Sequence, residues 1–379
     1  MSLAQPGSAG AETVEVLGDE LNHHWLTDGV GDVAIGEPLV PQLGDDTSPL
    51  HRGLAGGDVA RKGLDEAVEG AEHGVFARRG LDSHFPDPMQ QPLRPCRPCV
   101  PGYRRRMAPT AESTASRRTE FARLHDAGTF IMPNAWDTGS ALVLQSLGFE
   151  AVATTSSGFA AALGRHDQSV TLAELSVHVA DLCSALDIPV SVDAEAGYSE
   201  DRDGLARTVA QLAATGAAGV SIEDFLPRRG VVGLDEATER VAMFTNSAHE
   251  EGMVVTARAE NHLYGVGDLD DTIRRLQAYR EAGADVVYAP GLESTGDIAR
   301  LVSEVDAPVN VLMLPDGPSI PEMSRLGVRR VSTGGALAFA AYGALAAAGR
   351  ELLELGTCSF SSRSLTGEER IAAFGPDED

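Results

Sequence analysis

Eight short apolar runs, rich in β-branched residues, recur between positions 130 and 335 of this 379-residue chain. Amphipathic, helix-like stretches such as 171–187 and 268–284 separate them. Continuous apolar runs are typical of a parallel sheet that is covered on both faces. Eight β–α units within about 250 residues therefore predict an α/β fold, a (β/α)8 TIM barrel. The runs are FIMPNA (130–135), AVATTSS (151–157), PVSVDAE (189–195), GVSIED (219–224), VVTARA (254–259), VVYAP (286–290), VNVLML (309–314) and RVSTGG (330–335).

A doubly wound open sheet is the competing fold, but no G-x-G-x-x-G fingerprint follows the first run. We expect an additional helix over about 116–127, which would precede the first strand and cap the barrel. The longest apolar stretch, 336–349, is alanine-rich and about 14 residues long. It is too short to span a bilayer, and it predicts a packed helix instead.

Residues 1–106 differ in character from residues 107–379. The first segment has no sustained period of 2 or 3.6 residues, and it ends in the proline-rich, basic stretch PMQQPLRPCRPCVPGYRRR. Such a segment cannot bury enough apolar surface to offset the entropy lost on ordering. We therefore expect a disordered extension upstream of a start at Met107, followed by the barrel.

The charge balance and the cysteines bear on partners and compartment. Acidic residues outnumber basic ones by 56 to 30, and the net charge of −26 argues against nucleic acid and anionic membranes as partners. The first ten residues lack the basic and apolar regions of a signal peptide. The spacing of the four cysteines suggests no disulfide framework, so a reducing cytoplasm is the expected compartment.

Charged side chains gather at the carboxyl ends of the expected strands, where such barrels build their active sites. Asp193 and Glu195 end the third run two residues apart, so they point the same way. Glu223 ends the next run and Arg258 the one after it. Three converging carboxylates suit Mg²⁺, and Arg258 would bind a carboxylate or phosphonate. The alternative is a buried ion network in which Arg258 only pairs with Glu223 or Asp193.

The chain from about residue 126 to residue 360 resembles the phosphoenolpyruvate mutase/isocitrate lyase superfamily. The resemblance implies a (β/α)8 barrel, commonly a homotetramer whose C-terminal helix packs on a neighbouring subunit. It also implies a small 2-oxo acid substrate held by Mg²⁺, with Mn²⁺ as the alternative metal. The matching pieces, in order, are NAWDTGSA, TTSSGFAAALGRHD, VSVDAEAGY, GVSIED, TARAENHLYG, AYREAGADVVYAPG and GVRRVSTGGALA.

The resemblance also implies roles for single residues. Arg258 would contact the substrate and act in catalysis, and Asp167 would orient water on the metal. Tyr288 would lie at the substrate, where mutase-type members use a histidine. The implied metal ligands are Asp193, Glu195 and Glu223, and the backbone amides implied to bind the substrate carboxylate are those of Ser157, Gly158 and Phe159.

One loop departs from the family's pattern. Members that cleave isocitrate or methylisocitrate carry a Lys-Cys-Gly-His signature after the fourth strand, with the cysteine as general acid/base, whereas this chain has FLPRRGVVG at 225–233. Decarboxylation of an oxaloacetate-like acid needs no side chain to deprotonate a hydroxyl, so it is the reaction that the missing cysteine affects least. We therefore expect an Mg²⁺-dependent carbon–carbon lyase that acts on an oxaloacetate-like acid. Candidate proton donors are Tyr198, Tyr264, His166 and His262.

Three other functions stay open at this point. A mutase or hydrolase of the phosphonopyruvate or phosphoenolpyruvate type would use the same metal site. A phosphate-binding barrel enzyme would use STGGALA (332–338) at the start of the last helix, although these glycines would equally let that helix pack closely. A non-catalytic barrel that serves as a binding subunit would fit the altered loop.

Overall fold

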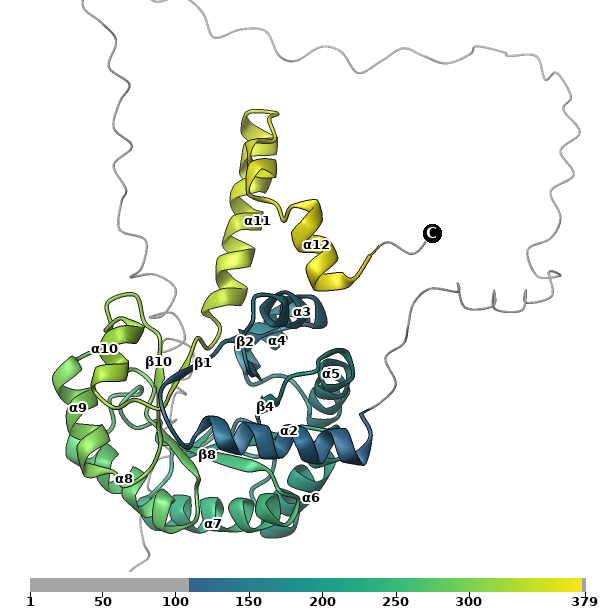
Figure 1. The fold of residues 1–379 in the computed structure, drawn as a ribbon. Helices are drawn as coiled ribbons and strands as arrows, with labels where there is room; N and C mark the ends of the chain where they lie inside the picture. Colours follow the sequence, from purple (N-terminus) through teal and green to yellow (C-terminus); the bar gives the residue numbers. More distant parts are fainter. Residues whose placement is uncertain (1–108, 377–379) are drawn as a thin grey trace, which may run out of the picture. The chain divides into compact units, whose positions relative to one another are not determined.

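The computed structural model describes residues 109–376, so the prediction for the segment 1–106 lies outside the described residues. Nine strands form one sheet in the order β1-β11-β10-β9-β8-β5-β4-β3-β2. Figure 1 shows helices arranged around these strands. Every pair in this sheet is parallel. The strands are β1 (Phe130–Met132), β2 (Asn134–Ala135), β3 (Val152–Thr154), β4 (Val190–Asp193), β5 (Gly219–Glu223), β8 (Val254–Arg258), β9 (Val286–Tyr288), β10 (Val309–Leu312) and β11 (Arg330–Ser332).

The two ends of this sheet, β1 and β2, are halves of one strand, and this closes the barrel. Pro133 separates them and has no N–H to donate to a ladder. The first half pairs with β11, and the second half pairs with β3. The eight predicted runs therefore form a (β/α)8 barrel, as expected from the sequence.

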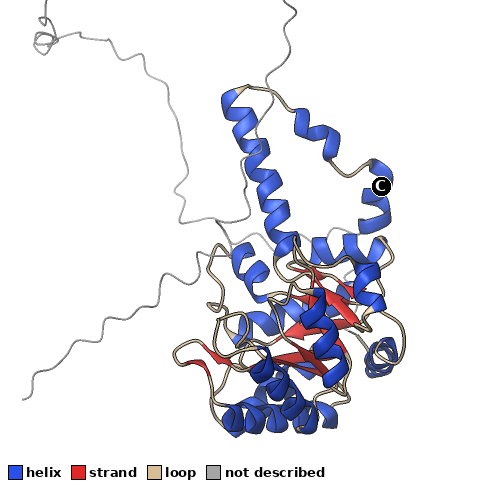
Figure 2. Ribbon diagram, turned by 90° about the vertical axis from the view of Figure 1, so that its left-hand side faces the viewer, coloured by secondary structure: helices blue, strands red, loops and turns tan. Residues whose placement is uncertain are grey.

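Helices cover the outside of the barrel (Figure 2). Most begin at a Thr, Ser or Asp whose side chain accepts a backbone N–H; at α5, Thr171 and Glu174 form a reciprocal capping box. The predicted helices at 171–187 and 268–284 are confirmed as α5 and α8. The helices are α2 (Ala111–Leu124), α3 (Thr138–Ser146), α4 (Ser156–Ala162), α5 (Leu172–Ala185), α6 (Arg202–Ala213), α7 (Leu234–Glu250), α8 (Leu269–Glu281), α9 (Thr295–Glu304), α10 (Ile320–Arg325), α11 (Ala336–Glu354), η2 (Ser359–Arg363) and α12 (Gly367–Phe374).

Helix α2 closes the amino-terminal end of the barrel, as the sequence predicted. It begins earlier than expected because Thr110 Oγ1 accepts a hydrogen bond from the Ser113 N–H and caps the helix. Phe121 is fully buried and meets the Phe130 ring edge-on at a centroid distance of 6.5 Å. Around it lie the first residues of several strands, so α2 seals this end with apolar side chains.

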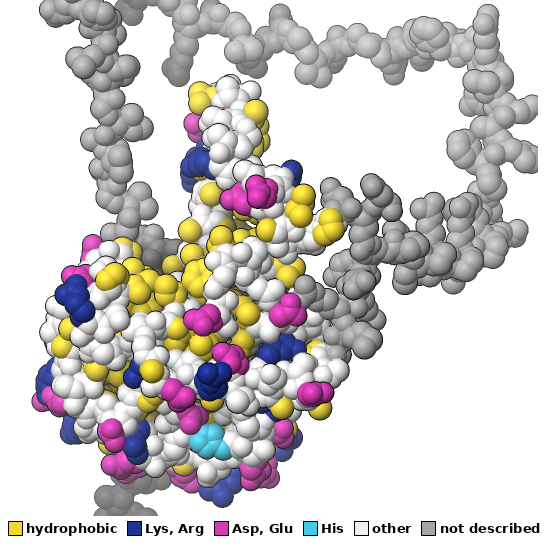
Figure 3. Space-filling view, in the orientation of Figure 1, with side chains coloured by type: hydrophobic (Ala, Val, Ile, Leu, Met, Phe, Trp, Pro, Cys, Tyr) yellow, Lys and Arg dark blue, Asp and Glu magenta, His cyan; other side chains and the backbone are white. Residues whose placement is uncertain are grey.

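The prediction for helix α11 is wrong in one respect, its packing. The stretch 336–349 was expected to be a packed helix, yet α11 runs on to Glu354, extends away from the barrel and is mostly exposed (Figures 1 and 3). Leu353, for example, is 89% exposed. By length and apolar composition alone, α11 could span a membrane. Core helices of soluble proteins can have the same length and composition. The chain then turns back, and α12 packs against α3.

Candidate active site

Sheet register brings the predicted charged residues together at the carboxyl end of the barrel. Asp193 ends β4, Glu223 ends β5 and Arg258 ends β8. Glu223 and Arg258 are direct neighbours across β5 and β8, and Arg258 stands opposite Tyr288 across β8 and β9. The parallel register thus brings three charged side chains and a tyrosine to the same end of the barrel.

Arg258 is the centre of this cluster, and its side chain is only 17% exposed. Its Nη1 lies 3.1 Å from Asp193 Oδ1 and 3.4 Å from Glu223 Oε2. Its Nε donates to Glu260 Oε1 at 2.8 Å. The guanidinium carbon lies 5.3 Å above the centre of the Tyr288 ring. The ion network described above as the alternative is therefore present in this structure.

Glu260 is a member of the cluster to which the sequence had given no role. It lies two residues after Arg258, the same spacing as Asp193 and Glu195, and this spacing is the signal that would have found it. The Glu260 N–H donates to Asp224 Oδ1 at 2.8 Å. Asp224 faces away from the mouth and also accepts from Arg275 Nη1 at 2.9 Å. This buried pair fixes the backbone that carries Glu260.

Glu195 enters the cluster from a strained turn. Glu195 and Tyr198 both have positive φ angles, 47° and 55°, which non-glycine residues rarely adopt. Gly197 between them, at φ 85°, has room for such a conformation because it has no Cβ. The Tyr198 hydroxyl donates to Glu195 Oε1 at 3.1 Å. Such strain is concentrated at functional sites, and here it aims Glu195 and Tyr198 at each other.

Burial and mutual repulsion shift the ionisation of these carboxylates. Burial and the charges of Asp193 and Asp167 raise the pKa of Glu195 to about 7. Burial also raises the pKa of Glu223 and of Glu260, although Arg258 opposes both shifts. Asp167 lies on the exposed rim, where desolvation by neighbouring atoms and the charge of Asp193 raise its pKa.

The donor set fits a hard divalent cation. Carboxylates outnumber the single guanidinium in the cluster, so its negative charge is incompletely compensated. Oxygen ligands of this kind suit Mg²⁺, which keeps several waters and needs only one or two protein carboxylates. Within residues 109–376, no three or more Asp, Glu, His or Cys side chains are gathered as a ready-made metal cage. The ligand assignment of Asp193, Glu195 and Glu223 stays a prediction.

Helix α4 places the residues predicted to bind the substrate carboxylate. The Gly158 N–H donates to Thr155 Oγ1 at 3.3 Å, and the Phe159 N–H donates to the Thr155 carbonyl at 3.0 Å. Both amides are thus used inside the helix, which argues against that role for Gly158 and Phe159. The Ser156 N–H donates to Asp193 Oδ2 at 3.3 Å and so ties the helix start to the cluster. The role of Ser157 stays a prediction.

The glycine-rich turn after β11 is held by Asn134. Its Oδ1 accepts the N–H groups of Thr333 and Gly334 at 2.9 and 2.8 Å. These amides would otherwise be the donors of a phosphate site. A Cβ on Gly335 would lie 2.6 Å from Ser157 Oγ. Close packing therefore accounts for Gly335, and Gly334 has a positive φ angle of 53°, which glycine adopts readily.

The loop that departs from the family's pattern forms a small hairpin of β6 (Phe225–Leu226) and β7 (Gly230–Val231). The Phe225 ring stacks on Tyr264 at a centroid distance of 4.2 Å. Arg229 makes two hydrogen bonds of 2.7 Å with Glu236 at the start of α7. Its aromatic and arginine side chains thus anchor this loop on both sides.

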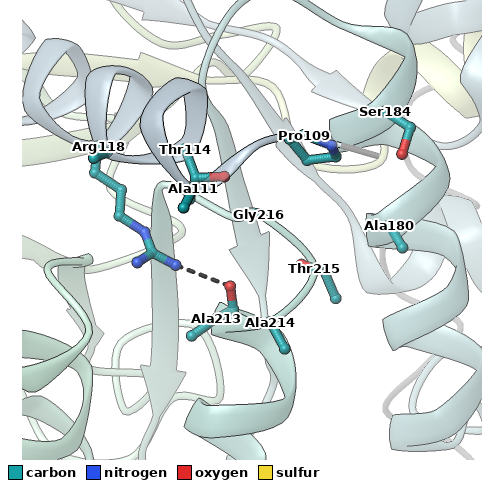
Figure 4. A pocket seen from close by; sticks show the side chains of 11 residues that line it. Pro109, Ala111, Thr114, Arg118, Ala180, Ser184, Ala213, Ala214, Thr215 and Gly216 are labelled. Carbon is teal, nitrogen blue, oxygen red and sulfur yellow. Dashed lines mark hydrogen bonds between the residues drawn. The ribbon is translucent and has the colours of Figure 1, made fainter. Parts of the chain in front are cut away.

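A surface pocket elsewhere does not belong to this site. It lies between α2, α5 and α6, toward the amino-terminal end of the barrel (Figure 4). Arg118 is its charged group, and it donates to the carbonyl oxygens of Ala213 and Ala217 at 2.9 and 3.0 Å. These bonds attach α2 to the barrel. We therefore interpret the pocket as a packing feature.

The molecule is thus a (β/α)8 barrel with its polar groups gathered at the end where barrel enzymes bind substrates. The sequence model of the phosphoenolpyruvate phosphomutase family matches residues 121–353, well over half of the chain. The chain therefore belongs to the phosphoenolpyruvate mutase/isocitrate lyase superfamily, whose members are lyases and mutases.

Three similar proteins show the range of names within this superfamily. A crystal structure from Burkholderia cenocepacia J2315 with a provisional lyase/mutase name is 42% identical, with a TM-score of 0.67, and covers 70% of this chain and 99% of that chain. An uncharacterized protein of Mycobacterium tuberculosis H37Rv is 36% identical over 56% of this chain and 81% of its own length. Oxaloacetate decarboxylase of Bradyrhizobium diazoefficiens is 28% identical over 55% of this chain and 74% of its own length.

Proposed function

We propose that this protein is an Mg²⁺-dependent carbon–carbon lyase that acts on a small 2-oxo acid, with oxaloacetate as the favoured substrate type. The bond that breaks joins the carbon beside the oxo group to the carboxylate that leaves as CO₂. The acid cluster around Arg258 carries this proposal, because it combines surplus carboxylates with a buried guanidinium. The similarity to an oxaloacetate decarboxylase supports it. So does the hairpin at 225–233, which lacks the cysteine acid of the isocitrate-cleaving members.

In this proposal, Asp193, Glu195 and Glu223 would hold Mg²⁺, directly or through water. The metal would supply Lewis-acid stabilisation of negative charge on the substrate's oxo oxygen. Arg258 would add positive charge at the same oxygen, from a position held by its three carboxylate contacts. Loss of CO₂ requires no side chain to deprotonate a hydroxyl, so the absence of a cysteine acid has no cost for this reaction.

The product enolate must then accept a proton at carbon. Tyr198 is the candidate donor that the geometry favours, because its hydroxyl lies in the cluster, 3.1 Å from Glu195. Tyr264 is half-buried and stacked against the hairpin. His166 lies exposed on the rim, where Asp167 would orient water.

We also propose that the protein is a cytoplasmic homo-oligomer, with a tetramer as the state that the superfamily resemblance implies. Helix α11 supports an oligomer, because Leu345, Leu352 and Leu353 are each more than half exposed along it. An exposed apolar surface of this kind is typical of a protein interface. The net charge of −26 favours small-molecule partners over nucleic acid or anionic membranes.

The test of the metal site is Asp193→Ala, with Asp181→Ala on the exposed face of α5 as the matched control. Calorimetric titration measures Mg²⁺ binding, and coupled detection of pyruvate measures turnover of oxaloacetate. We expect Asp193→Ala to lose both and Asp181→Ala to keep both. Wild-type turnover in the Asp193→Ala variant would overturn the proposal.

A further inference from the structure

The hydrogen-bond ladder between β3 and β4 is replaced by side chains just before the mouth of the barrel. Parallel pairing of the two strands stops at Ala153 and Ser191. If the ladder continued in this register, the Asp193 N–H would donate to the Thr154 carbonyl. The Asp193 N–H donates instead to the Thr154 hydroxyl oxygen, Oγ1, at 2.9 Å. A threonine side chain thus takes over from the ladder at a residue that is predicted to bind the metal.

Asn134 binds the carbonyl that the ladder leaves free. Its Nδ2 donates to the Thr154 carbonyl at 2.6 Å. The orientation of this side-chain amide is fixed, because its Oδ1 accepts the N–H groups of Thr333 and Gly334 and an amide nitrogen could not accept them. Two side chains therefore share the groups that a regular ladder would join. Asn134 takes the Thr154 carbonyl, and the Thr154 hydroxyl takes the Asp193 N–H.

The turn from β3 into α4 is the reason for this exchange. Thr155 is the N-cap of α4, so the chain leaves the sheet directly after Thr154. The Ser156 N–H at the start of the helix donates to Asp193 Oδ2 at 3.3 Å. Asp193 is consequently held twice by this corner, at its backbone N–H and at one carboxylate oxygen. Its other oxygen, Oδ1, lies 3.1 Å from Arg258 Nη1.

Both replacement bonds lie in the interior of the protein. Thr154 is 1% exposed and Asn134 is 8% exposed. A buried backbone group that loses its partner costs free energy, so removal of either side chain favours a shift of the backbone toward another partner. At Asp193 such a shift redirects the carboxylate. Mg²⁺ demands near-ideal octahedral geometry, and its binding is therefore sensitive to the direction of each ligand.

We propose that Asn134 and Thr154 are positioning residues that set the direction of the Asp193 carboxylate and thereby the Mg²⁺ affinity of the site. This inference rests on the metal site of the proposed function and not on its reaction. Replacement of groups that orient a metal ligand typically lowers metal affinity or activity by about 10–100-fold. The turn after β11 contributes as well, because its amides hold the Asn134 side chain in place.

The substitution Thr154→Val removes the acceptor of the Asp193 N–H and keeps the shape of the side chain. We expect the Kd for Mg²⁺, measured by calorimetric titration without substrate, to rise about tenfold or more. Thr154→Ser keeps the hydroxyl and should restore a Kd near the wild-type value. Thr245→Val is the matched control. Thr245 is buried on α7, and its hydroxyl has no hydrogen-bond partner within residues 109–376, so the Kd should not change.

The substitution Asn134→Asp tests the second bond, and it carries the test alone if Thr154→Val does not fold. Aspartate keeps the acceptors for Thr333 and Gly334 and loses only the donor to the Thr154 carbonyl. The added negative charge would by itself attract Mg²⁺. A higher Kd in this variant, which we expect, therefore reports the displacement of Thr154 and not the charge. A Kd at or below the wild-type value would overturn the role of Asn134.

The comparison of Kd with stability separates positioning from a structural role. A merely structural role would lower Tm in Thr154→Val and leave the Kd for Mg²⁺ unchanged. Positioning also predicts that this variant needs more Mg²⁺ for half-maximal turnover, whereas kcat at saturating Mg²⁺ stays near wild type. A folded Thr154→Val variant with the wild-type Kd would overturn the inference. A wild type that bound Mg²⁺ without releasing pyruvate would refute the proposed reaction, and the Kd values would still decide this inference.

Discussion

Replacing Arg258 with glutamine removes the guanidinium that contacts the mouth carboxylates and leaves a shorter, uncharged amide in its place. Glu260, Glu223 and Asp193 all contact Arg258, and none of their side chains is more than 15% exposed. Removing one partner of a buried ion pair costs about 3–5 kcal/mol. For a domain of this size, where 1 kcal/mol corresponds to about 2–4 °C, the expected loss in Tm is roughly 6–20 °C.

The pH dependence of this loss identifies its cause. In the variant, the destabilisation comes from repulsion between ionised carboxylates. The deficit should therefore shrink as the pH falls from 8 to 5, where Glu195, with its pKa of about 7, takes up a proton. Mg²⁺ should likewise restore more stability to the variant than to the wild type, because a bound cation replaces the lost charge.

Thermal unfolding followed by circular dichroism, at pH 5 and pH 8 and with or without Mg²⁺, measures these effects. Arg229→Gln is the matched control. Arg229 lies on the hairpin loop and forms an exposed ion pair with Glu236 of α7, so this substitution should change Tm little. A Tm for Arg258→Gln equal to wild type at pH 8, or a deficit that grows on acidification, would refute the reasoning.

Three further results are expected. Burial lowers the pKa of His178 to about 4, so this side chain binds fewer protons in the folded state than in the unfolded state below pH 6.5. The contribution of His178 alone should therefore lower stability by about 3 kcal/mol as the pH drops from 6.5 to 4, and denaturant titrations should show that His178→Gln loses less stability than the wild type over this range. Phe121→Ala should cost about 3–5 kcal/mol in the same titrations, because its ring fills the capped end of the barrel; a loss under 1 kcal/mol would contradict that packing. Leu345→Arg with Leu353→Arg should lower the oligomeric mass measured by light scattering, and an unchanged mass would place the interface elsewhere.

The barrel could be predicted from the sequence because each strand is a local apolar run and the β–α alternation is regular. The split of the first strand at Pro133 left this pattern intact. The exposure of α11 could not be predicted from its own residues, because the pattern of an alanine-rich helix is the same whether the helix packs on its own barrel or on another chain. Only the family resemblance implied packing on a neighbouring subunit. Leu345 and Leu353 show their exposure only in the structure.

The sequence predicted which strands carry the charged residues of the site, but not which of their atoms are in contact. Spacing of two residues put Asp193 and Glu195 on one face. It could not reveal that Thr155 caps α4 and takes up the Gly158 amide, because that depends on where the strand gives way to a helix. The spacing of residues also did not predict the buried position of Arg330. Its neutral partners, such as Asn310, lie on other strands and come into contact with it only in the folded barrel.

The most direct test of the account is Mg²⁺-dependent release of pyruvate from oxaloacetate by the full chain, corrected for spontaneous decarboxylation. Phosphonopyruvate, phosphoenolpyruvate and substituted malates form the comparison panel. The account predicts that oxaloacetate is turned over, that a chelator abolishes the activity and that Mg²⁺ restores it. Turnover that is unaffected by the chelator, or activity confined to the phosphorus-containing acids, would contradict it.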